Sequence, residues 1–509
     1  MKEPLHIVWI VMDATRAKSC SFSNPGLGLE TTPRLEELAR EAVVYEQAVS
    51  SACWTMASHA SMFTGTYPSR HGLVFDGDRL SDQFLTVAEV LQKEGYRTTA
   101  YSDNPYVSPF SGLHRGFSHF VDDIMDAVPV RAYRWLKQRR RKSDAGFSSD
   151  GQIRHVEAVD YSGYGPWMKR AIWEATRFFD KGASRVVREA GTEVELAHRA
   201  GDSAFVFMHF GETHAPYLPM GYFRDRFMPA GMGLKPWLVN QNAYRHFLGQ
   251  CRMPPEDFEL LTALYHASIA YLDDQIGRLV TFLRRRGLLD RSLLIVTSDH
   301  GENVGDHGMM GHQWSLADTL IHVPLLVRYP GGGSGGTRVV GQVQTMDLAP
   351  TLLSVISGQR TQDELARLRE EQFDADVREL PREANAPATH PVAFSELLKP
   401  FGPDADRLRT SLKKYDRQLL TARTPEWKWQ WASDGGESLF RLGTGEDEER
   451  DLIDQQVETA AGLRNAAADR LAAVQAFIAE QKARLSGDSS LDVEEEVKER
   501  LRALGYIDG

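Results

Sequence analysis

Cysteine is scarce in this chain, whose 509 residues contain three: Cys20, Cys53 and Cys251. An odd number of widely spaced cysteines does not form the disulfide framework of a small secreted domain. The cysteine content fits a reducing compartment, and we expect a cytoplasmic protein.

The sequence also lacks an apolar run of about 18 residues, the length that a membrane-spanning helix needs. The first apolar run, Leu5 to Met12, contains His6, ends at Asp13 and is followed by no small-residue cleavage site. We interpret this run as a strand rather than a signal peptide. Neither a membrane span nor a secretory leader is expected.

Positive charge is in the minority, since the formal net charge is −11. Nucleic acid is therefore not expected as the main partner. The apolar content of 42% over 509 residues is ample for a large core and for two units. The composition shifts after Gly358, so we place the units at residues 1–358 and 359–509.

Apolar runs alternate with helix-like segments along the first unit. Predicted strands cover 6–12, 43–48, 96–102, 203–210, 293–296 and 323–329, and predicted helices include 58–64, 86–94, 255–286 and 345–356. This alternation predicts an α/β fold with a doubly wound, mostly parallel sheet. The second unit is predicted to be a smaller α+β unit, with short strands over 391–443, a hairpin at 434–436 and helices at 456–486 and 497–504.

Two charged segments interrupt this order. Residues 120–200 are expected to form a helical insertion that packs over or beside the functional site. We interpret the basic run at 137–142 as a solvated helix end, with an anionic substrate or a membrane surface as alternative contacts. Residues 359–390 are charged and polar, and are expected to be a linker or a mobile surface segment.

Potential metal ligands follow two of the predicted strands. Asp13 ends the first strand, and Asp299-His300 ends the strand at 293–296, at the carboxyl ends where ligands bind in open α/β sheets. Thr55 lies just before the helix at 58–64. These four side chains offer two carboxylates, one imidazole and one hydroxyl, so we expect them to bind one divalent metal ion. The imidazole favours zinc or manganese over calcium.

Thr55 is the candidate nucleophile, because a bound metal and a helix N-terminus both lower the pKa of a hydroxyl and favour attack on phosphorus or sulfur. His214 or His312 would orient a non-bridging oxygen or protonate the leaving group. Each residue also has a structural alternative: Asp13 as a turn residue, Thr55 as a helix cap, and His59 as an ordinary residue on a helix surface.

Seven motifs carry a family resemblance. They are Ile7–Asp13, Thr31–Leu35, Trp54–Pro68, His214–Tyr217, Tyr271–Asp274, Thr297–Glu302 and Asp347–Thr351. In this order and spacing they resemble the sulfatase family of the alkaline phosphatase superfamily. The resemblance covers most of the chain and implies an alkaline-phosphatase-like fold and a metal-dependent ester hydrolase.

The nucleophile motif departs from the signature of that family, which is Cys or Ser, any residue, Pro, any residue, Arg. Its first residue is oxidised to formylglycine, whereas residues 55–59 of this chain read Thr-Met-Ala-Ser-His. Threonine cannot give that aldehyde, so formylglycine is not expected. The second carboxylate of the family falls at Ala14, and two cationic positions fall at His59 and His312.

A threonine nucleophile resembles the phosphodiesterase, phosphonate-ester hydrolase and phosphoglycerol-transferase branches of the superfamily. We therefore predict that Thr55 attacks a phosphate diester or a phosphonate monoester, and that water clears a phospho-threonine intermediate. His59, His214 and His312 are the predicted catalytic histidines. In an alternative arrangement, Glu212, His214 and His312 hold a second metal ion.

Three other functions remain as alternatives at this point. The first is a sulfate-ester hydrolase that uses the Thr55 alkoxide without formylglycine. The second is a catalytically inactive binding protein on the same fold, and the third is a transferase that acts on lipid head groups. In each enzymatic case the expected partner is a small-molecule phosphate, phosphonate or sulfate ester. The sequence gives no indication of an oligomeric state.

Overall fold

The protein is represented by a computed structural model, which describes residues 3–74, 78–102, 104–122, 180–229, 231–232, 235–356, 359–398, 415–443 and 448–485. The predicted basic run at 137–142 and the predicted helix at 497–504 lie outside the described residues. The described end of the expected insertion forms α7 (Ala183–Ala200).

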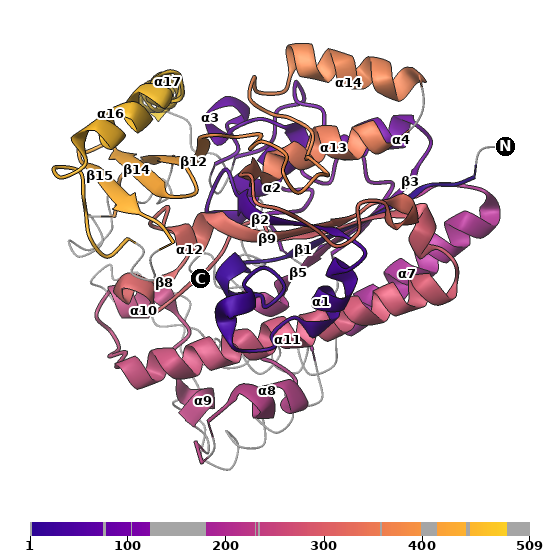
Figure 1. The fold of residues 1–509 in the computed structure, drawn as a ribbon, viewed down its shortest axis with the longest axis horizontal. Helices are drawn as coiled ribbons and strands as arrows, with labels where there is room; N and C mark the ends of the chain where they lie inside the picture. The colour runs from indigo at the N-terminus through magenta and orange to yellow at the C-terminus, as the bar shows by residue number, and fades with distance from the viewer. Residues whose placement is uncertain are drawn as a thin grey trace, which may run out of the picture.

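A large sheet forms the centre of the molecule (Figure 1). Among the described residues it has nine strands. Their order is β10 (Thr337–Val339), β2 (Val43–Val49), β9 (His322–Arg328), β6 (Ser292–Thr297), β1 (His6–Met12), β5 (Ala204–Phe210), β3 (Arg97–Ser102) and β4 (His119–Val121), with β11 (Val343–Gln344) paired to β2. Strand β9 runs antiparallel to β2 and β6, and the other pairs are parallel. The predicted doubly wound, mostly parallel sheet is thus confirmed.

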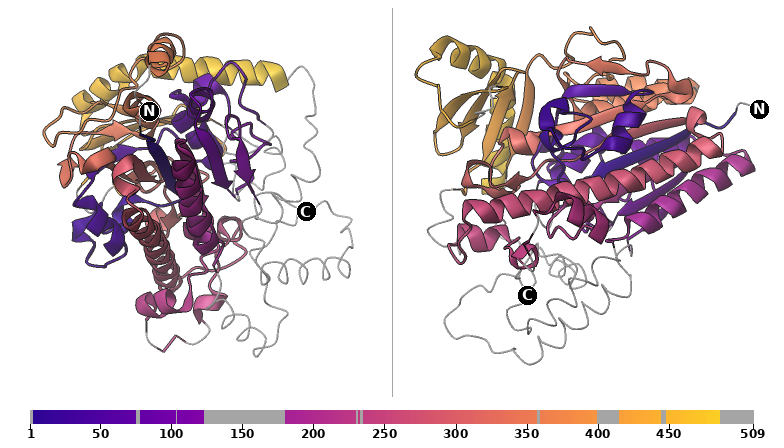
Figure 2. Two further views of the ribbon diagram at one scale, coloured as in Figure 1. Left: turned by 90° about the vertical axis from the view of Figure 1, so that its right-hand side faces the viewer. Right: turned by 60° about the horizontal axis from the view of Figure 1, so that its bottom comes forward.

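Helices cover both faces of this sheet (Figures 1 and 2). One face packs against α2 (Thr55–Thr64), α4 (Val87–Lys93), α13 (Leu348–Val355) and α14 (Gln359–Glu371). The other packs against α1 (Pro33–Ala39), α7 and the long α11 (Pro255–Arg285). Along β1, Trp9 belongs to the first core and its neighbours Val8 and Ile10 to the second, as the two-residue period of a strand requires. Burial of each such aliphatic side chain stabilises the fold by about 2 kcal/mol.

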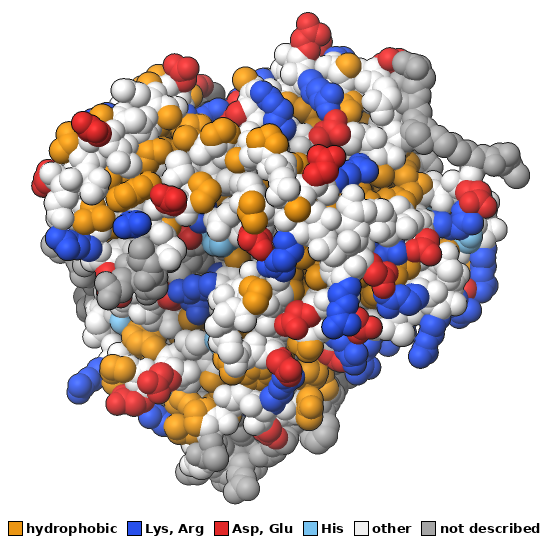
Figure 3. Space-filling model, viewed as in Figure 1, with side chains coloured by type: hydrophobic (Ala, Val, Ile, Leu, Met, Phe, Trp, Pro, Cys, Tyr) orange, Lys and Arg blue, Asp and Glu red, His pale blue; other side chains and the backbone are white. Residues whose placement is uncertain are grey.

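Several short elements lie between these layers and the surface. They are α3 (Pro68–His71), α8 (Gly221–Phe227), α9 (Lys235–Leu238), α10 (Ala243–Phe247), α12 (Asp318–Ile321), and the two-stranded ribbon of β7 (Asn303–Val304) and β8 (Met310–Gly311). On the face drawn in Figure 3, acidic, basic and apolar side chains are interspersed. No helix in the described parts of the chain has both the length and the apolar character that a membrane crossing needs.

The C-terminal part forms a second, antiparallel sheet, drawn in orange to yellow in Figure 1. It consists of β12 (Ala393–Leu397), β13 (Leu419–Arg423), β14 (Trp427–Ala432) and β15 (Glu437–Arg441), with α16 (Val457–Ala466) and α17 (Ala468–Leu485) packed against it. The predicted hairpin at 434–436 connects β14 to β15. This arrangement matches the predicted smaller α+β unit, while the boundary at residue 358 stays a prediction.

The interpretation of residues 359–390 as a linker or mobile surface segment is wrong. This segment begins with α14, in which Leu365 and Leu368 are buried against the core of the first face. Phe373 and Leu380, which follow the helix, are buried in the same core. The segment was misinterpreted because most residues of α14 are charged. Two apolar residues three positions apart are enough to pack one side of an amphipathic helix against the core.

Ion pairs connect the C-terminal sheet to the segment that follows His312. The Arg423 guanidinium on β13 donates to both carboxylate oxygens of Asp318, at 2.5 and 3.1 Å. Lys428 on β14 is buried and donates to the Leu316 carbonyl oxygen at 2.6 Å. Residues 316–318 are therefore held by contacts with the second sheet.

A buried imidazole makes the stability of this region depend on pH. Although burial opposes its charged form, the Asp347 and Asp376 carboxylates raise the pKa of His390 to about 9. Its Nε2 lies 2.9 Å from Asp347 Oδ1.

We expect this pair to stabilise the fold by about 3 kcal/mol below pH 6.5, and the stabilisation to disappear as pH rises through 9. The difference in free energy of unfolding between wild type and His390→Asn, measured by urea denaturation, should shrink from pH 6 to pH 9.5. His119→Gln, at an exposed histidine, is the control. A difference that stays constant over this range would contradict the assignment.

Candidate active site

Three neighbouring strands and one helix start meet at the candidate site. Asp13 follows β1 and Asp299-His300 follow β6, while Thr55 is the first residue of α2. Strands β6, β1 and β5 lie side by side in the sheet, so their carboxyl ends share one edge. Helix α2 begins at Thr55 and not at 58 as predicted, which places the hydroxyl on the first turn of the helix.

The structure brings the four predicted metal ligands together. Thr55 Oγ1 lies 3.1 Å from His300 Nε2. The same nitrogen lies 3.4 Å from Asp299 Oδ2 and 3.7 Å from Asp13 Oδ1. All four side chains are buried.

The hydrogen bonds around these predicted ligands leave two carboxylate oxygens and one imidazole nitrogen available to bind a metal ion. Asp299 Oδ1 accepts from the backbone N–H groups of Ala14 and His300, at 3.2 and 2.9 Å. Within the described part of the chain, Asp13 Oδ1 and Asp299 Oδ2 accept no hydrogen bond. His300 Nδ1–H donates to the Gly301 carbonyl at 2.9 Å, which leaves a lone pair on Nε2. This donor set fits a divalent transition metal ion.

The turn after β1 is fixed by backbone contacts. Ala14 has a positive φ of 57°, in the left-handed region, which costs an alanine on the order of 1 kcal/mol. Its N–H donates to Asp299, and its carbonyl accepts from the Tyr265 hydroxyl at 2.8 Å. These two contacts offset the strain and orient Asp13 beside Asp299.

His59 and His209 complete the surroundings of Asp299. His59 is completely buried on α2, which rules out the surface position considered for it. Its Nδ1 lies 3.6 Å from Asp299 Oδ2, and His209 Nε2 lies 3.3 Å from Asp13 Oδ2. Sequence reasoning missed His209, because a single histidine within an apolar strand has the appearance of a core residue.

Charge is distributed unevenly among these groups. Burial alone would raise the pKa of Asp299, but the imidazoles of His300, His209 and His59 hold this pKa well below its usual value. Burial would lower the pKa of His209, but the carboxylates of Asp13 and Asp299 raise it. Burial and the neighbouring His209 lower the pKa of His59 to about 3.

A second group of side chains lies beside His300. The ring of His312 is 4.3 Å from that of His300 and 5.2 Å from that of His214, centroid to centroid. Burial and His300 lower the pKa of His312 to about 3. His312 Nδ1 lies 3.1 Å from Glu302 Oε1, and the Tyr217 hydroxyl donates to Glu302 Oε2 at 3.1 Å.

Glu212 does not point into this group. Its Oε1 accepts from the Ala183 N–H at 2.9 Å, at the start of α7. Among the described residues, Glu212 belongs to no cluster with the spacing of metal ligands. The alternative metal set of Glu212, His214 and His312 is thus wrong for Glu212, because its carboxylate satisfies the free N–H of a helix end instead. Glu302 stands beside His312.

Comparison with known proteins identifies the family to which this geometry belongs. The family model described as Sulfatase matches residues 6–358. The chain belongs to the sulfatase family.

Relatives within the sulfatase family share about a quarter of their residues with this chain. The ulvan-active sulfatase of Formosa agariphila is 26% identical over 355 residues, which are 69% of this chain and 61% of that protein. The multifunctional alkaline phosphatase superfamily protein PehA of Trinickia caryophylli is 23% identical over 403 residues, 70% of this chain and 74% of that protein. The chain thus matches less than two thirds of the length of the first relative.

Solved structures share the sulfatase-family fold. The phosphonate monoester hydrolase of Agrobacterium radiobacter superposes with a TM-score of 0.64 at 20% identity, over 93% of this chain and 95% of that one. The predicted alkaline-phosphatase-like fold is confirmed, and family membership supports the expected metal-dependent ester hydrolase. Asp13, Asp299 and His300 have the spacing of metal ligands, and the Thr55 hydroxyl lies 3.1 Å from His300, so these four side chains could hold a metal ion.

Proposed function

We propose that this protein hydrolyses phosphate diesters or phosphonate monoesters with Thr55 as the nucleophile. The observation that carries the proposal is the Thr55 hydroxyl, 3.1 Å from His300 Nε2 at the point where Asp13 and Asp299 converge. A threonine cannot become formylglycine, so the hydroxyl itself must attack. A divalent metal ion bound there would lower the pKa of this hydroxyl and draw charge from the ester.

Residues of the chain favour the reactive state of Thr55 in two further ways. The hydroxyl stands at the positive end of α2, where a developing negative charge is stabilised. Complete burial of the surrounding side chains strengthens each electrostatic contact, because water does not screen it. The Thr55 alkoxide forms a bond to phosphorus as the bond from phosphorus to the leaving oxygen breaks. Water then hydrolyses the resulting threonine ester, which still carries the second substituent of phosphorus.

His312 is the proposed acid for the leaving group. Its Nε2 has no hydrogen-bond partner among the described residues, while its Nδ1 faces Glu302. With Glu302 protonated, the Nε2–H of His312 passes to the leaving oxygen while Nδ1 takes the proton of the Glu302 carboxyl group, so the imidazole stays neutral. His214 is held beside it, since Lys181 donates to the Gly211 and His214 carbonyl oxygens at 2.7 Å each.

A sulfate-ester hydrolase is the second candidate, favoured by the similarity to the ulvan-active sulfatase. A sulfate monoester has one negative charge, as has a phosphate diester or a phosphonate monoester, so the charge of the site does not separate them. An inactive binding protein is the less favoured reading, because the ligand set of Asp13, Thr55, Asp299 and His300 is complete.

A rate panel tests the proposal. The protein, supplied with zinc, manganese or calcium, is assayed with nitrophenyl phosphate, bis-nitrophenyl phosphate, phenylphosphonate nitrophenyl ester and nitrophenyl sulfate. We expect the highest kcat/KM for the diester or the phosphonate ester, in zinc or manganese. A preference for the sulfate ester would replace the proposal with the second candidate. No turnover of any ester by metal-loaded protein would favour the inactive binding protein.

A further inference from the structure

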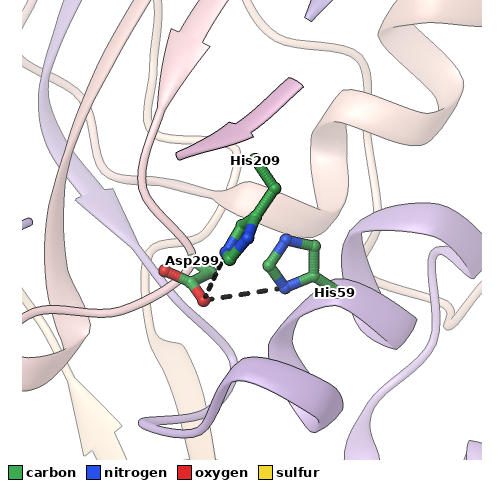
Figure 4. A group of neighbouring side chains, drawn as sticks. All are labelled: His59, His209 and Asp299. Carbon is green, nitrogen blue, oxygen red and sulfur yellow. Dashed lines mark ion pairs between the residues drawn. The ribbon is translucent and has the colours of Figure 1, made fainter. Parts of the chain in front are cut away.

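A second cluster of potential ligands lies directly against the four residues of the first. It consists of His59 from α2, His209 from β5 and Asp299 after β6. Figure 4 shows both imidazoles directed at one oxygen of the Asp299 carboxylate. These three side chains are at most 3% exposed.

The distances in this cluster are too long for hydrogen bonds and suit ligands of one ion. Asp299 Oδ2 lies 3.6 Å from His59 Nδ1 and 3.8 Å from His209 Nε2. A hydrogen bond between such atoms would measure about 2.8 Å. Ligands on one tetrahedral zinc ion, each bonded at about 2.1 Å, stand about 3.4 Å apart. In the described part of the chain, His209 Nε2 and Asp299 Oδ2 make no hydrogen bond.

The charge around Asp13 and Asp299 also points to a cation. Among the described residues, these two carboxylates form ion pairs with imidazoles alone, those of His59, His209 and His300. Two buried carboxylates are stable only when positive charge or strong donors compensate them.

We propose that His59, His209 and Asp299 bind a second divalent transition metal ion, and that Asp299 Oδ2 bridges it to the ion held by Asp13, Thr55, Asp299 and His300. Two imidazoles and one carboxylate are ligands that zinc and manganese accept. The bridge places the two ions at the short separation typical of two-metal sites, about 3.5–4 Å. This inference holds whichever ester is the substrate.

Binding of this ion requires proton shifts at His59 and His209. His59 Nδ1 lies 2.8 Å from the Thr55 carbonyl oxygen, to which its N–H donates. A ligating nitrogen cannot donate, so the proton of His59 must move to Nε2, which has no partner among the described residues. His209 must lose any proton on Nε2. The second ion therefore binds with release of protons and less tightly at low pH.

Metal stoichiometry tests the proposal without an activity assay. Chelator-treated full-length protein is dialysed against excess zinc, and bound zinc per chain is measured by elemental analysis. We expect two ions in wild type and one each in His59→Gln and His209→Gln. Asp299→Asn removes the bridge and is expected to lose both ions.

His71→Gln is the matched control, because His71 is a buried histidine that bonds to Ser61 and Leu73 away from the cluster. It should retain two ions. Manganese-loaded wild type should also show the exchange-coupled spin resonance of two ions that share a ligand atom. One ion in saturated wild type overturns the proposal, whatever the folding of the variants. Two ions retained in both histidine variants would overturn it as well.

Discussion

Thr55→Ala is expected to lower kcat/KM for the preferred ester by on the order of 10⁴-fold, because the substitution removes the attacking hydroxyl. Steady-state rates on the nitrophenyl esters measure this loss. Thr55→Ser keeps the hydroxyl beside His300 and should stay within about tenfold of wild type. Mass spectrometry of acid-quenched wild type should find, on the peptide that contains Thr55, the phosphoryl or phosphonyl group together with the substituent that does not leave.

Thr64→Ala is the matched control for this experiment. Thr64 lies on the same helix, is equally buried, and donates to the Ala60 carbonyl rather than into the site. Its rate should be near that of wild type. A Thr55→Ala protein that keeps more than a tenth of the wild-type rate would remove Thr55 from the mechanism.

Gly301→Ala should lower the free energy of unfolding by on the order of 3 kcal/mol or more. A Cβ at this position would overlap the backbone carbonyl oxygen of Thr319 and lie 3.1 Å from Arg16 Cβ. The backbone at 319–320 cannot easily move away from Gly301, because the Gly301 N–H donates to the Leu320 carbonyl oxygen at 2.7 Å. Urea denaturation measures the loss. Catalytic rates should fall as well, because Asp299 and His300 precede this residue.

Gly462→Ala provides the comparison on α16. A Cβ there has no atom within 4 Å, and the residue is helical, so alanine should be neutral or stabilise by up to about 1 kcal/mol. Gly301→Ala with the stability and rate of wild type would show that the loop at 299–301 has more space than its close approach to Thr319 indicates.

Local patterns predicted most of the strands and helices, and they pointed to the four side chains that the structure brings together. Strands β1 and β6 are apolar runs that are followed by Asp13 and Asp299. Because parallel strands end at the same edge of a sheet, residues that follow them are expected to lie at that edge. Thr55 could be predicted because the family motif includes it. Its distance from His300 could not be, since it depends on how α2 docks on the sheet.

The residues that sequence reasoning missed depend on neighbours far along the chain. His209 gains its role because β5 lies beside β1, which is 200 residues away and invisible to local periodicity. Glu212 was considered as a metal ligand together with His214 and His312, yet its carboxylate accepts from the Ala183 N–H at the start of α7. Helix α14 looked polar because its two buried leucines are a small part of its composition.

The contacts of Arg423 and Lys428 with residues 316–318 have a consequence for how the chain melts. The family match ends at residue 358, but the segment after His312 is anchored by a sheet that begins at residue 393. Loss of that sheet would leave the Asp318 carboxylate without the guanidinium that now compensates it. The two units, residues 1–358 and 359–509, should therefore unfold in one calorimetric transition. A chain truncated at residue 358 should not keep the folded structure of the first unit.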